Sequence, residues 1–322
     1  MYRLLLTVCL SGFGAVFAGA QSPRLEVVSI EQGLSQGFIS GSCQDRQGFL
    51  WFGTKNGLNR YDGYEFVTFK NDAYDPHALS DNQVIDVCDA GEFLCVMAQD
   101  QINLFHKRTH RFFRLPKGAG VPSRYLGGGC LAENDHVVWL YLLLPEGKRC
   151  YRINWPPEMP DQLLRDTAAM GSVRATRMFS DLDISSICMS ADRKSLWLVT
   201  NTGQLVRKPL PDGPLSTTRV PISNTQGLGM IPAGNTGAVV GSLRQDTLAW
   251  YNPNASAATP WTIWRSDSRT GGINALDFDD THNSLWIFIK SELREYDTGR
   301  PLEVLDQANA RFAMPISEGV WK

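Results

Sequence analysis

A short apolar motif, centred on tryptophan or an apolar substitute, recurs six times along the chain. The central residues of the six copies are Trp51, Cys95, Trp139, Trp197, Val240 and Trp286. The steps between them are 44, 44, 58, 43 and 46 residues. Short apolar runs alternate with turn residues around each copy, which predicts four short strands per repeat. A single four-stranded sheet would leave both of its faces exposed to solvent, so neighbouring sheets must cover them. A repeat length of forty to fifty residues therefore indicates sheets stacked as the blades of a β-propeller.

The predicted fold is therefore all-β: a β-propeller with four-stranded blades, six complete and a seventh partial. The first blade is the clearest, and its four strands are expected at Phe38–Gln44, Phe49–Thr54, Leu58–Asp62 and Glu65–Lys70. The single long step of 58 residues contains Pro156–Gly171, which predicts an inserted loop with one helical turn.

Both ends of the chain add a segment to the six repeats. Leu25–Ile30 is typical of a strand that precedes the first blade, and Pro315–Trp321 resembles the start of a seventh blade. We expect the N-terminal strand to form the outer strand of that blade. An unfinished blade would leave sheet edges unpaired, so the sequence is expected to be one piece of a longer receptor.

The first 20 residues are typical of a cleavable secretory signal peptide. One early cation, Arg3, precedes an apolar stretch of 14 residues, Leu4–Phe17, and small residues follow up to Ala20. That apolar run is shorter than the roughly 20 residues a membrane-spanning helix needs. Lipid attachment at Cys9 is disfavoured because Val8 precedes it. We therefore expect cleavage after Ala20 and a propeller domain over residues 21–322 that is exported from the cytoplasm.

Charge and motifs exclude several classes of function. The chain has 31 Lys and Arg against 33 Asp and Glu, which is not the balance of a nucleic-acid-binding surface. No nucleophile elbow, phosphate loop or dinucleotide fingerprint occurs. The triple glycine Gly127–Gly129 is attributed to tight packing of an inner strand. We expect no catalytic site and no cofactor in this chain.

Two groups of residues with metal-ligating side chains give only a weak indication of a metal site. His106 and His110 flank a predicted hairpin turn and have no third ligand nearby. The acidic group Asp277, Asp279 and Asp280 suggests calcium, but His282 stands where a calcium loop of the EF type needs glycine. This group, and the pair Asp181 and Asp183, are interpreted as solvated turns, so no metal site is predicted.

Six cysteines follow the signal peptide. Four of them, Cys43, Cys88, Cys130 and Cys188, recur near the ends of successive inner strands, where small apolar side chains fit. We interpret them as free buried thiols whose side chains point past one another. The alternative of a Cys88–Cys95 disulfide across one hairpin stays open, because those two residues face each other in the predicted register.

Ligand binding is the natural use of a propeller face. Loops between second and third strands, and loops from an outer strand to the next inner strand, gather on one face around the channel. The candidate ligand-binding residues on these loops are Gln36, Lys55, Asn56, Asn82, Asp100, Asn201 and Gln245. Their amide and charged groups can donate to hydroxyl groups or accept from them.

The stretch Gln47–Phe69 (QGFLWFGTKNGLNRYDGYEFVTF), with Glu31–Ser40 before it and Asn71–Val84 after it, resembles the two-component regulator propeller family. The resemblance is specific over Leu25–Leu115. The fourth repeat keeps part of the motif at Asp192, Trp197, Thr200, Gly203 and Leu205, and the sixth at Asp280, Trp286, Leu293, Tyr296 and Asp297. The second, third and fifth repeats depart from it.

The resemblance implies the N-terminal portion of the periplasmic sensor region of a hybrid two-component histidine kinase receptor of the Bacteroidetes type. Such a receptor is anchored in the inner membrane and carries a kinase that is absent from this sequence. The implied ligand is a small molecule, an oligosaccharide, and the implied partner is a second propeller of the same receptor or a second copy in a homodimer. Two alternatives stay open: a secreted propeller enzyme acting on carbohydrate, and a binding scaffold without a signalling partner.

Overall fold

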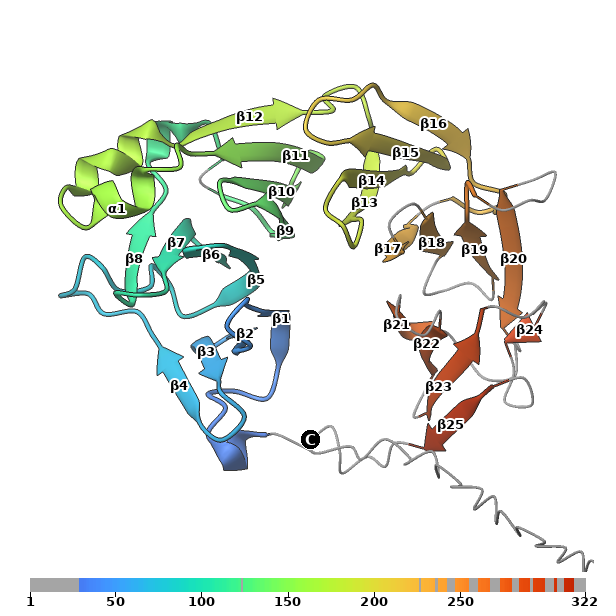
Figure 1. The fold of residues 1–322 in the computed structure, drawn as a ribbon, viewed down its shortest axis with the longest axis horizontal. Helices are drawn as coiled ribbons and strands as arrows, with labels where there is room; N and C mark the ends of the chain where they lie inside the picture. The colour runs from blue at the N-terminus through green and yellow to red at the C-terminus, as the bar shows by residue number, and fades with distance from the viewer. Residues whose placement is uncertain are drawn as a thin grey trace, which may run out of the picture.

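Six separate sheets arranged in an arc make up the protein (Figure 1). The computed structural model describes residues 29–122, 124–225, 227–234, 237–241, 247–254, 260–266, 273–279, 284–289, 292–298, 304–305 and 310–315. The predicted signal peptide lies outside the described residues, as do most of Leu25–Ile30 and Pro315–Trp321. The first strand follows a 3-10 helix, η1 (Ile30–Gln32).

Each sheet is one blade. Blade one has β1 (Ile39–Gln44), β2 (Leu50–Thr54), β3 (Gly57–Tyr61) and β4 (Phe66–Phe69). Blade two has β5 (Val84–Ala90), β6 (Phe93–Ala98), β7 (Ile102–His106) and β8 (Arg111–Arg114), followed by the 3-10 helix η2 (Lys117–Ala119). Blade three has β9 (Gly127–Asn134), β10 (Val137–Leu144), β11 (Gly147–Asn154) and β12 (Arg174–Met178).

The last three blades continue the same order. Blade four has β13 (Ile184–Met189), β14 (Ser195–Thr200), β15 (Gln204–Pro209) and β16 (Ser216–Arg219). Blade five has β17 (Gly229–Ala233), β18 (Gly237–Gly241), β19 (Thr247–Tyr251) and β20 (Trp261–Ser266), and blade six has β21 (Ile273–Asp279), β22 (Ser284–Ile289), β23 (Glu292–Asp297) and β25 (Phe312–Pro315). A two-residue strand, β24 (Val304–Leu305), leaves blade six to pair in parallel with β20.

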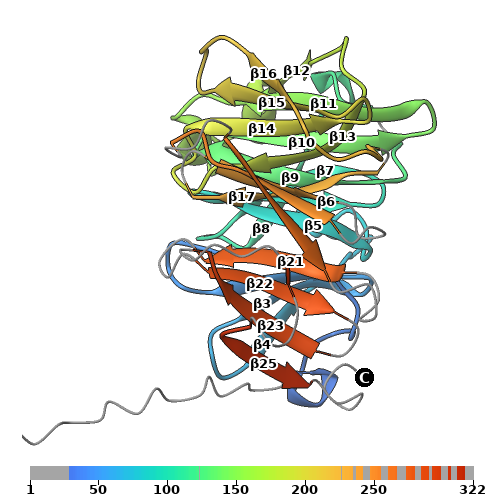
Figure 2. The ribbon, with the colours of Figure 1, turned by 90° about the vertical axis from the view of Figure 1, so that its right-hand side faces the viewer.

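Within a blade the strands run antiparallel from the centre of the arc to its rim. The inner strands face the centre and the outer strands lie at the periphery (Figure 1), while Figure 2 shows the blades from the side. The predicted first blade is confirmed to within one or two residues at each strand end. The predicted insertion is confirmed as well, because helix α1 (Met159–Leu163) and the 3-10 helix η3 (Thr167–Ser172) lie between β11 and β12.

Hydrophobic clusters fill the space between successive blades. Each of the five clusters of buried residues draws its members mainly from two neighbouring blades. Between blades one and two, for example, the Trp51 ring lies 5.3 Å from the Phe105 ring in an edge-to-face contact. Trp51, Trp139 and Trp197 are buried, so the predicted packing role of these indoles is confirmed, whereas Trp286 is only half-buried.

Side-chain hydrogen bonds also join one blade to the next. The Ser40 hydroxyl of blade one donates to the Val84 carbonyl of blade two at 2.6 Å. The Ser185 hydroxyl of blade four donates in the same way to the Leu228 carbonyl ahead of β17, at 2.8 Å. Both serines occupy a register shift in an inner strand, between Ile39 and Gly41 or between Ile184 and Ser186. The shift therefore places a hydroxyl where it can bridge two sheets that share no strand pairing.

An acidic residue at the end of the inner strand recurs with the repeat. Asp45, Asp89 and Glu133 stand 44 residues apart, and all three are buried. Asp45 accepts a hydrogen bond from the Trp51 indole N–H at 2.8 Å, and Glu133 accepts one from Trp139 at 2.9 Å. Asp89, whose blade has a cysteine in place of tryptophan, pairs with Lys107 instead at 2.8 Å. The acid therefore joins the inner strand to the second or third strand of its own blade.

The six described blades form an open arc and do not meet as a ring (Figure 1). Two predictions about the ends of the chain need correction. Ile30, expected in a strand, lies in η1, and Pro315, expected to open a seventh blade, is the last residue of β25 in blade six. No seventh blade occurs within the described residues.

The explanation of the triple glycine is confirmed at two of its three positions. A Cβ on Gly128 would lie 2.2 Å from the Tyr141 carbonyl oxygen, and one on Gly129 would lie 3.1 Å from an Asp86 carboxylate oxygen. Gly127 has no atom that close, so packing does not require glycine there.

Acid is expected to destabilise the fold through His106. Its imidazole is buried against Phe93, with Nε2 unpartnered and Nδ1 hydrogen bonded to Thr109. Burial and the nearby Arg108 lower the pKa of His106, although Glu92 and Asp161 oppose them. The unfolded chain therefore binds a proton more readily than the folded chain. The contribution of His106 to the free energy of unfolding is therefore complete above the pKa of histidine in the unfolded chain, about 6.5, and is lost as pH falls below that value.

Urea unfolding between about pH 7.5 and pH 5 measures this effect, because carboxylates contribute equally to the wild type and to His106→Gln. We expect the unfolding free energy of the wild type to fall more steeply with acid than that of the variant. Parallel pH profiles for the two proteins would show that His106 does not contribute.

Candidate functional site

Two faces of the arc carry the turns between strands. One, the binding face, carries the turns between second and third strands and the connectors from each outer strand to the next inner strand. The other, the opposite face, carries the remaining turns. This division follows from the antiparallel order of each blade. All seven candidate residues from the sequence were placed on loops of the binding face.

Two neighbouring cavities lie on the binding face at blades two and three. The first, of about 470 Å³, is lined by Asp100, Gln101, Ile102, Leu115, Pro116, Lys117, Val121, Pro122 and Arg124. The second, of about 460 Å³, is lined by Gln99, Asp100, Arg124, Tyr125, Leu126 and Pro145. Asp100 and Arg124 line both cavities, which makes these two side chains the centre of the candidate site.

The turn between β6 and β7 presents Asp100. Its carboxylate is exposed and accepts one hydrogen bond, from the Ser80 hydroxyl at 2.7 Å. Ser80 is itself held by blade two, because the Asn103 side-chain amide donates to the same hydroxyl at 2.9 Å. The carboxylate therefore has a fixed position and keeps acceptor capacity for a ligand.

The connector from η2 to β9 presents Arg124. The next residue, Tyr125, is buried, and its hydroxyl donates to the Ala98 carbonyl at the end of β6. Burial raises the pKa of Tyr125, so the hydroxyl stays protonated and keeps donating. Arg124 is exposed, and no hydrogen bond or ion pair holds it among the residues that the structure describes. The anchored Tyr125 therefore holds the backbone of Arg124 in place, while the Arg124 guanidinium remains available to a ligand.

Other groups around the two cavities complete a mixed polar and apolar lining. Lys117, in η2, places a second exposed cation at the first cavity. Leu126 is 65% exposed and lies at the second cavity. Small-molecule sites typically combine apolar walls with a few polar groups, as these cavities do.

The opposite face has a larger groove, of about 590 Å³, with a different electrostatic arrangement. In this groove the arginine side chains form ion pairs with carboxylates of the protein. The Arg46 guanidinium is paired with Asp135, and the Arg108 guanidinium lies 3.2 Å from Asp161. A ligand would have to compete with these ion pairs, so we place the candidate site on the binding face.

Four of the seven predicted residues build the loops of blade one and its junction with blade two. The Gln36 side chain accepts from the Phe38 backbone N–H at 2.8 Å, and the Lys55 ammonium lies 5.0 Å from the Phe38 ring centre. The Asn56 side chain donates to the Ser35 carbonyl at 3.0 Å. The Asn82 side chain accepts from the Asn71 N–H at 2.7 Å.

The remaining three predicted residues are scattered. Asn201, on blade four, donates to the Asp183 carboxylate at 3.0 Å, and Gln245 lies outside the described residues. Of the seven, only Asp100 lines the paired cavities. Sequence reasoning missed Arg124 and Lys117, which lie in an irregular connector. The available signal was a pair of cations in a segment rich in proline and glycine just before an inner strand.

The two histidine rings make separate aromatic contacts. His106 contacts Phe93, whereas the His110 ring stacks on Phe105 at 5.9 Å in a different cluster. Asp277 is exposed, and Asp280 lies outside the described residues. Among the helices of the described part, none has the length and apolar character needed to cross a membrane.

Comparison with known sequences finds one family model. Residues 33–56 match the model described as Two component regulator propeller. A segment of 76 residues is 36% identical to Histidine kinase P4 of Formosa agariphila, which corresponds to 23% of this chain and 6% of that protein. The chain therefore matches a small part of this relative's length.

Comparison with solved structures shows the fold. The chain superposes on an extracellular domain assigned to a hybrid two component system of B. thetaiotaomicron with a TM-score of 0.58 and 18% identity, covering 92% of this chain and 37% of that one. The Cps50 (Swd1) beta-propeller domain of Myceliophteria thermophila gives a TM-score of 0.56 at 14% identity, covering 88% and 87%. The β-propeller prediction is confirmed, and the similarity to the two-component regulator propeller model lies at residues 33–56, in blade one and the segment before it.

Proposed function

We propose that this chain is a ligand-sensing propeller from the periplasmic part of a two-component receptor, and that it binds its ligand at the paired cavities on the binding face. The observation that carries the proposal is the pair of cavities sharing Asp100 and an unpartnered Arg124. The family repeat in blade one supports the signalling role. Residues 21–322 would form this sensor domain after removal of the signal peptide.

The proposed ligand is an oligosaccharide. Its hydroxyls would find acceptors on Asp100 and donors on Arg124 and the glutamine side chains, while the less polar faces of its rings would lie against Leu126 and Pro145. Because Lys117 and Arg124 outnumber the single carboxylate, the site favours a sugar that also carries an acidic group.

Signalling requires that the ligand bind two arrangements of the receptor with different affinity, because a ligand of equal affinity would not change the equilibrium between them. The paired cavities lie at the junction between two blades and include a long connector. A ligand held between Asp100 and Arg124 would stiffen that junction and alter how this propeller packs against a second propeller or a second copy of the receptor.

Calorimetric titration of the exported chain against neutral and uronate-containing oligosaccharides tests the proposal. We expect at least one sugar to bind, and Asp100→Ala or Arg124→Ala to weaken its affinity by tenfold or more, since each substitution removes a charge-assisted hydrogen bond worth about 1.5–3 kcal/mol. The loss for Arg124→Ala should be larger with the acidic sugar.

The matched controls are Asp161→Ala and Arg46→Ala, which remove an exposed acid and an exposed cation from the opposite face. Both should bind the sugar as the wild type does. Failure of the whole panel to bind would remove the carbohydrate proposal, and equal losses in the control variants would remove the assigned site.

A further inference from the structure

Three cysteine side chains meet between blades two and three. Cys88 of β5 and Cys95 of β6 are directly opposite each other in the strand register, and Cys130 comes from β9 of the next blade. Their three sulfur atoms all lie within 4.8 Å of one another. The sequence prediction of inner-strand thiols that point past one another is therefore wrong for Cys88 and Cys130. All three thiols are free, so the alternative of a Cys88–Cys95 disulfide is not the form seen in this structure.

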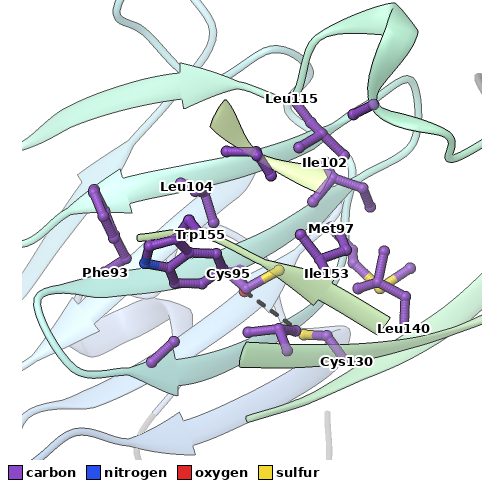
Figure 3. Packing of buried hydrophobic residues seen from close by; sticks show 14 of the residues in the cluster. Phe93, Cys95, Met97, Ile102, Leu104, Leu115, Cys130, Leu140, Ile153 and Trp155 are labelled. Atoms are coloured by element: carbon purple, nitrogen blue, oxygen red, sulfur yellow. Dashed lines mark hydrogen bonds between the residues drawn. The ribbon is translucent and has the colours of Figure 1, made fainter. Parts of the chain in front are cut away.

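The surroundings of this thiol triad fix the positions of its sulfurs. All three cysteines are buried within the cluster that fills the space between the two blades, to which Met97 and Leu140 also belong. Figure 3 shows Cys95 and Cys130 in this cluster. The Cys130 thiol donates to the Cys95 carbonyl at 3.6 Å. The backbone N–H of Cys130 is held by the Asp86 carboxylate at 2.8 Å. Close packing leaves the sulfurs little freedom to separate.

The spacing suits coordination of one cation. Three thiolates bonded at about 2.3 Å to a common centre place their sulfur atoms about 4 Å apart. Sulfur atoms that all lie within 4.8 Å of one another therefore need only small rotations to close around an ion. Two of the ligands are cross-strand neighbours and the third is on the adjacent sheet, so bound metal would join the two blades.

A cavity of about 350 Å³ lies beside the triad at the centre of the arc, and Cys88 and Cys130 are among the residues that line it. A three-thiolate complex of a divalent cation carries one net negative charge. The charged residues that line the cavity are Arg193, Asp86 and Asp89, and Asp89 is paired with Lys107.

We propose that Cys88, Cys95 and Cys130 form a site for a thiophilic d¹⁰ cation, either Zn²⁺ or Cu⁺. Soft thiolate ligands select these ions over Mg²⁺ or Ca²⁺. Binding of Zn²⁺ forms three metal–sulfur bonds and releases three thiol protons, with no change in oxidation state; water from the central cavity can fill the fourth position. Because the ligands span two blades, occupancy stabilises their junction.

Metal titration of the full chain, reduced and handled without oxygen, tests the site. In the first arm, Co²⁺ bound at a zinc-type site gives a thiolate-to-metal absorbance band, and added Zn²⁺ abolishes that band by displacing Co²⁺. In the second arm, the protein competes with a chromogenic chelator for Cu⁺. We expect one ion per chain in at least one of these two arms, and a rise in the melting temperature with the same ion.

Cys95→Ala should weaken binding at least 100-fold, while Cys150→Ala, which removes an equally buried thiol from another cluster, should bind as the wild type does. Cys130→Ala provides a second test if Cys95→Ala fails to fold, as judged by its melting transition. Absence of binding in both arms, or equal binding by Cys95→Ala, would overturn the proposal. A disulfide among the three cysteines in the exported protein would overturn it as well.

Discussion

Replacing Trp139 with alanine is expected to lower the free energy of unfolding by about 3–5 kcal/mol, because it empties a fully enclosed site between blades three and four. The Trp139 side chain is 0% exposed, and its ring stacks on Phe179 at 5.8 Å with an angle of 15° between the planes. The Arg152 guanidinium lies 5.8 Å from the ring centre on the same sheet. Urea denaturation of both proteins measures the loss.

Tyr64→Ala is the matched aromatic control, since Tyr64 is 93% exposed in a turn of blade one. Its effect should stay within about 0.5 kcal/mol. If Trp139→Ala were no more destabilising than this control, the assignment of the indole to the space between blades would be wrong.

Replacing Glu133 with alanine is expected to lower the free energy of unfolding by about 2–4 kcal/mol, because it leaves the buried Trp139 indole and the partly buried Arg152 guanidinium without their acceptor. One Glu133 oxygen accepts from the Trp139 indole at 2.9 Å and from Arg152 Nε at 3.2 Å, and the other accepts from the Arg152 guanidinium at 3.2 Å. The Glu133 side chain is 5% exposed, so water replaces these bonds poorly.

Glu133→Gln separates the hydrogen bond from the charge. The glutamine carbonyl can still accept from Trp139, but it loses the ionic part of the contact with Arg152. We expect its loss of unfolding free energy to be less than half that of Glu133→Ala, measured by the same urea denaturation. Equal losses would mean that the indole bond contributes nothing and that the ion pair dominates.

The fold was predictable from the sequence because one physical requirement repeats in every blade. An apolar side chain at the centre of the second strand, most often an indole, must be enclosed by the neighbouring sheet. Its spacing of 44 residues from Trp51 to Cys95 and on to Trp139 therefore marks the blades. Individual blades depart from this pattern only at single positions. Blade four carries Ala191 six residues before Trp197, where blades one and three carry an acid before their tryptophan, and the Trp197 indole N–H is buried without an acceptor in the described structure.

The candidate site was only partly predictable. Asp100 was found because it lies in a turn between two strongly patterned strands, which fixes the face that it occupies. Arg124 and Lys117 were missed because their positions depend on an irregular connector held by the Tyr125 hydroxyl. The thiol triad was missed because the sequence gives the strand register within a blade but not the distance between blades.

Hydrogen exchange with and without a saturating sugar from the calorimetric panel tests the central claim, that the ligand binds between Asp100 and Arg124. We expect slower exchange in peptides that contain these residues, and unchanged exchange in peptides that contain Arg108 or Asp135 on the opposite face. Protection confined to Arg108 and Asp135 would contradict the account.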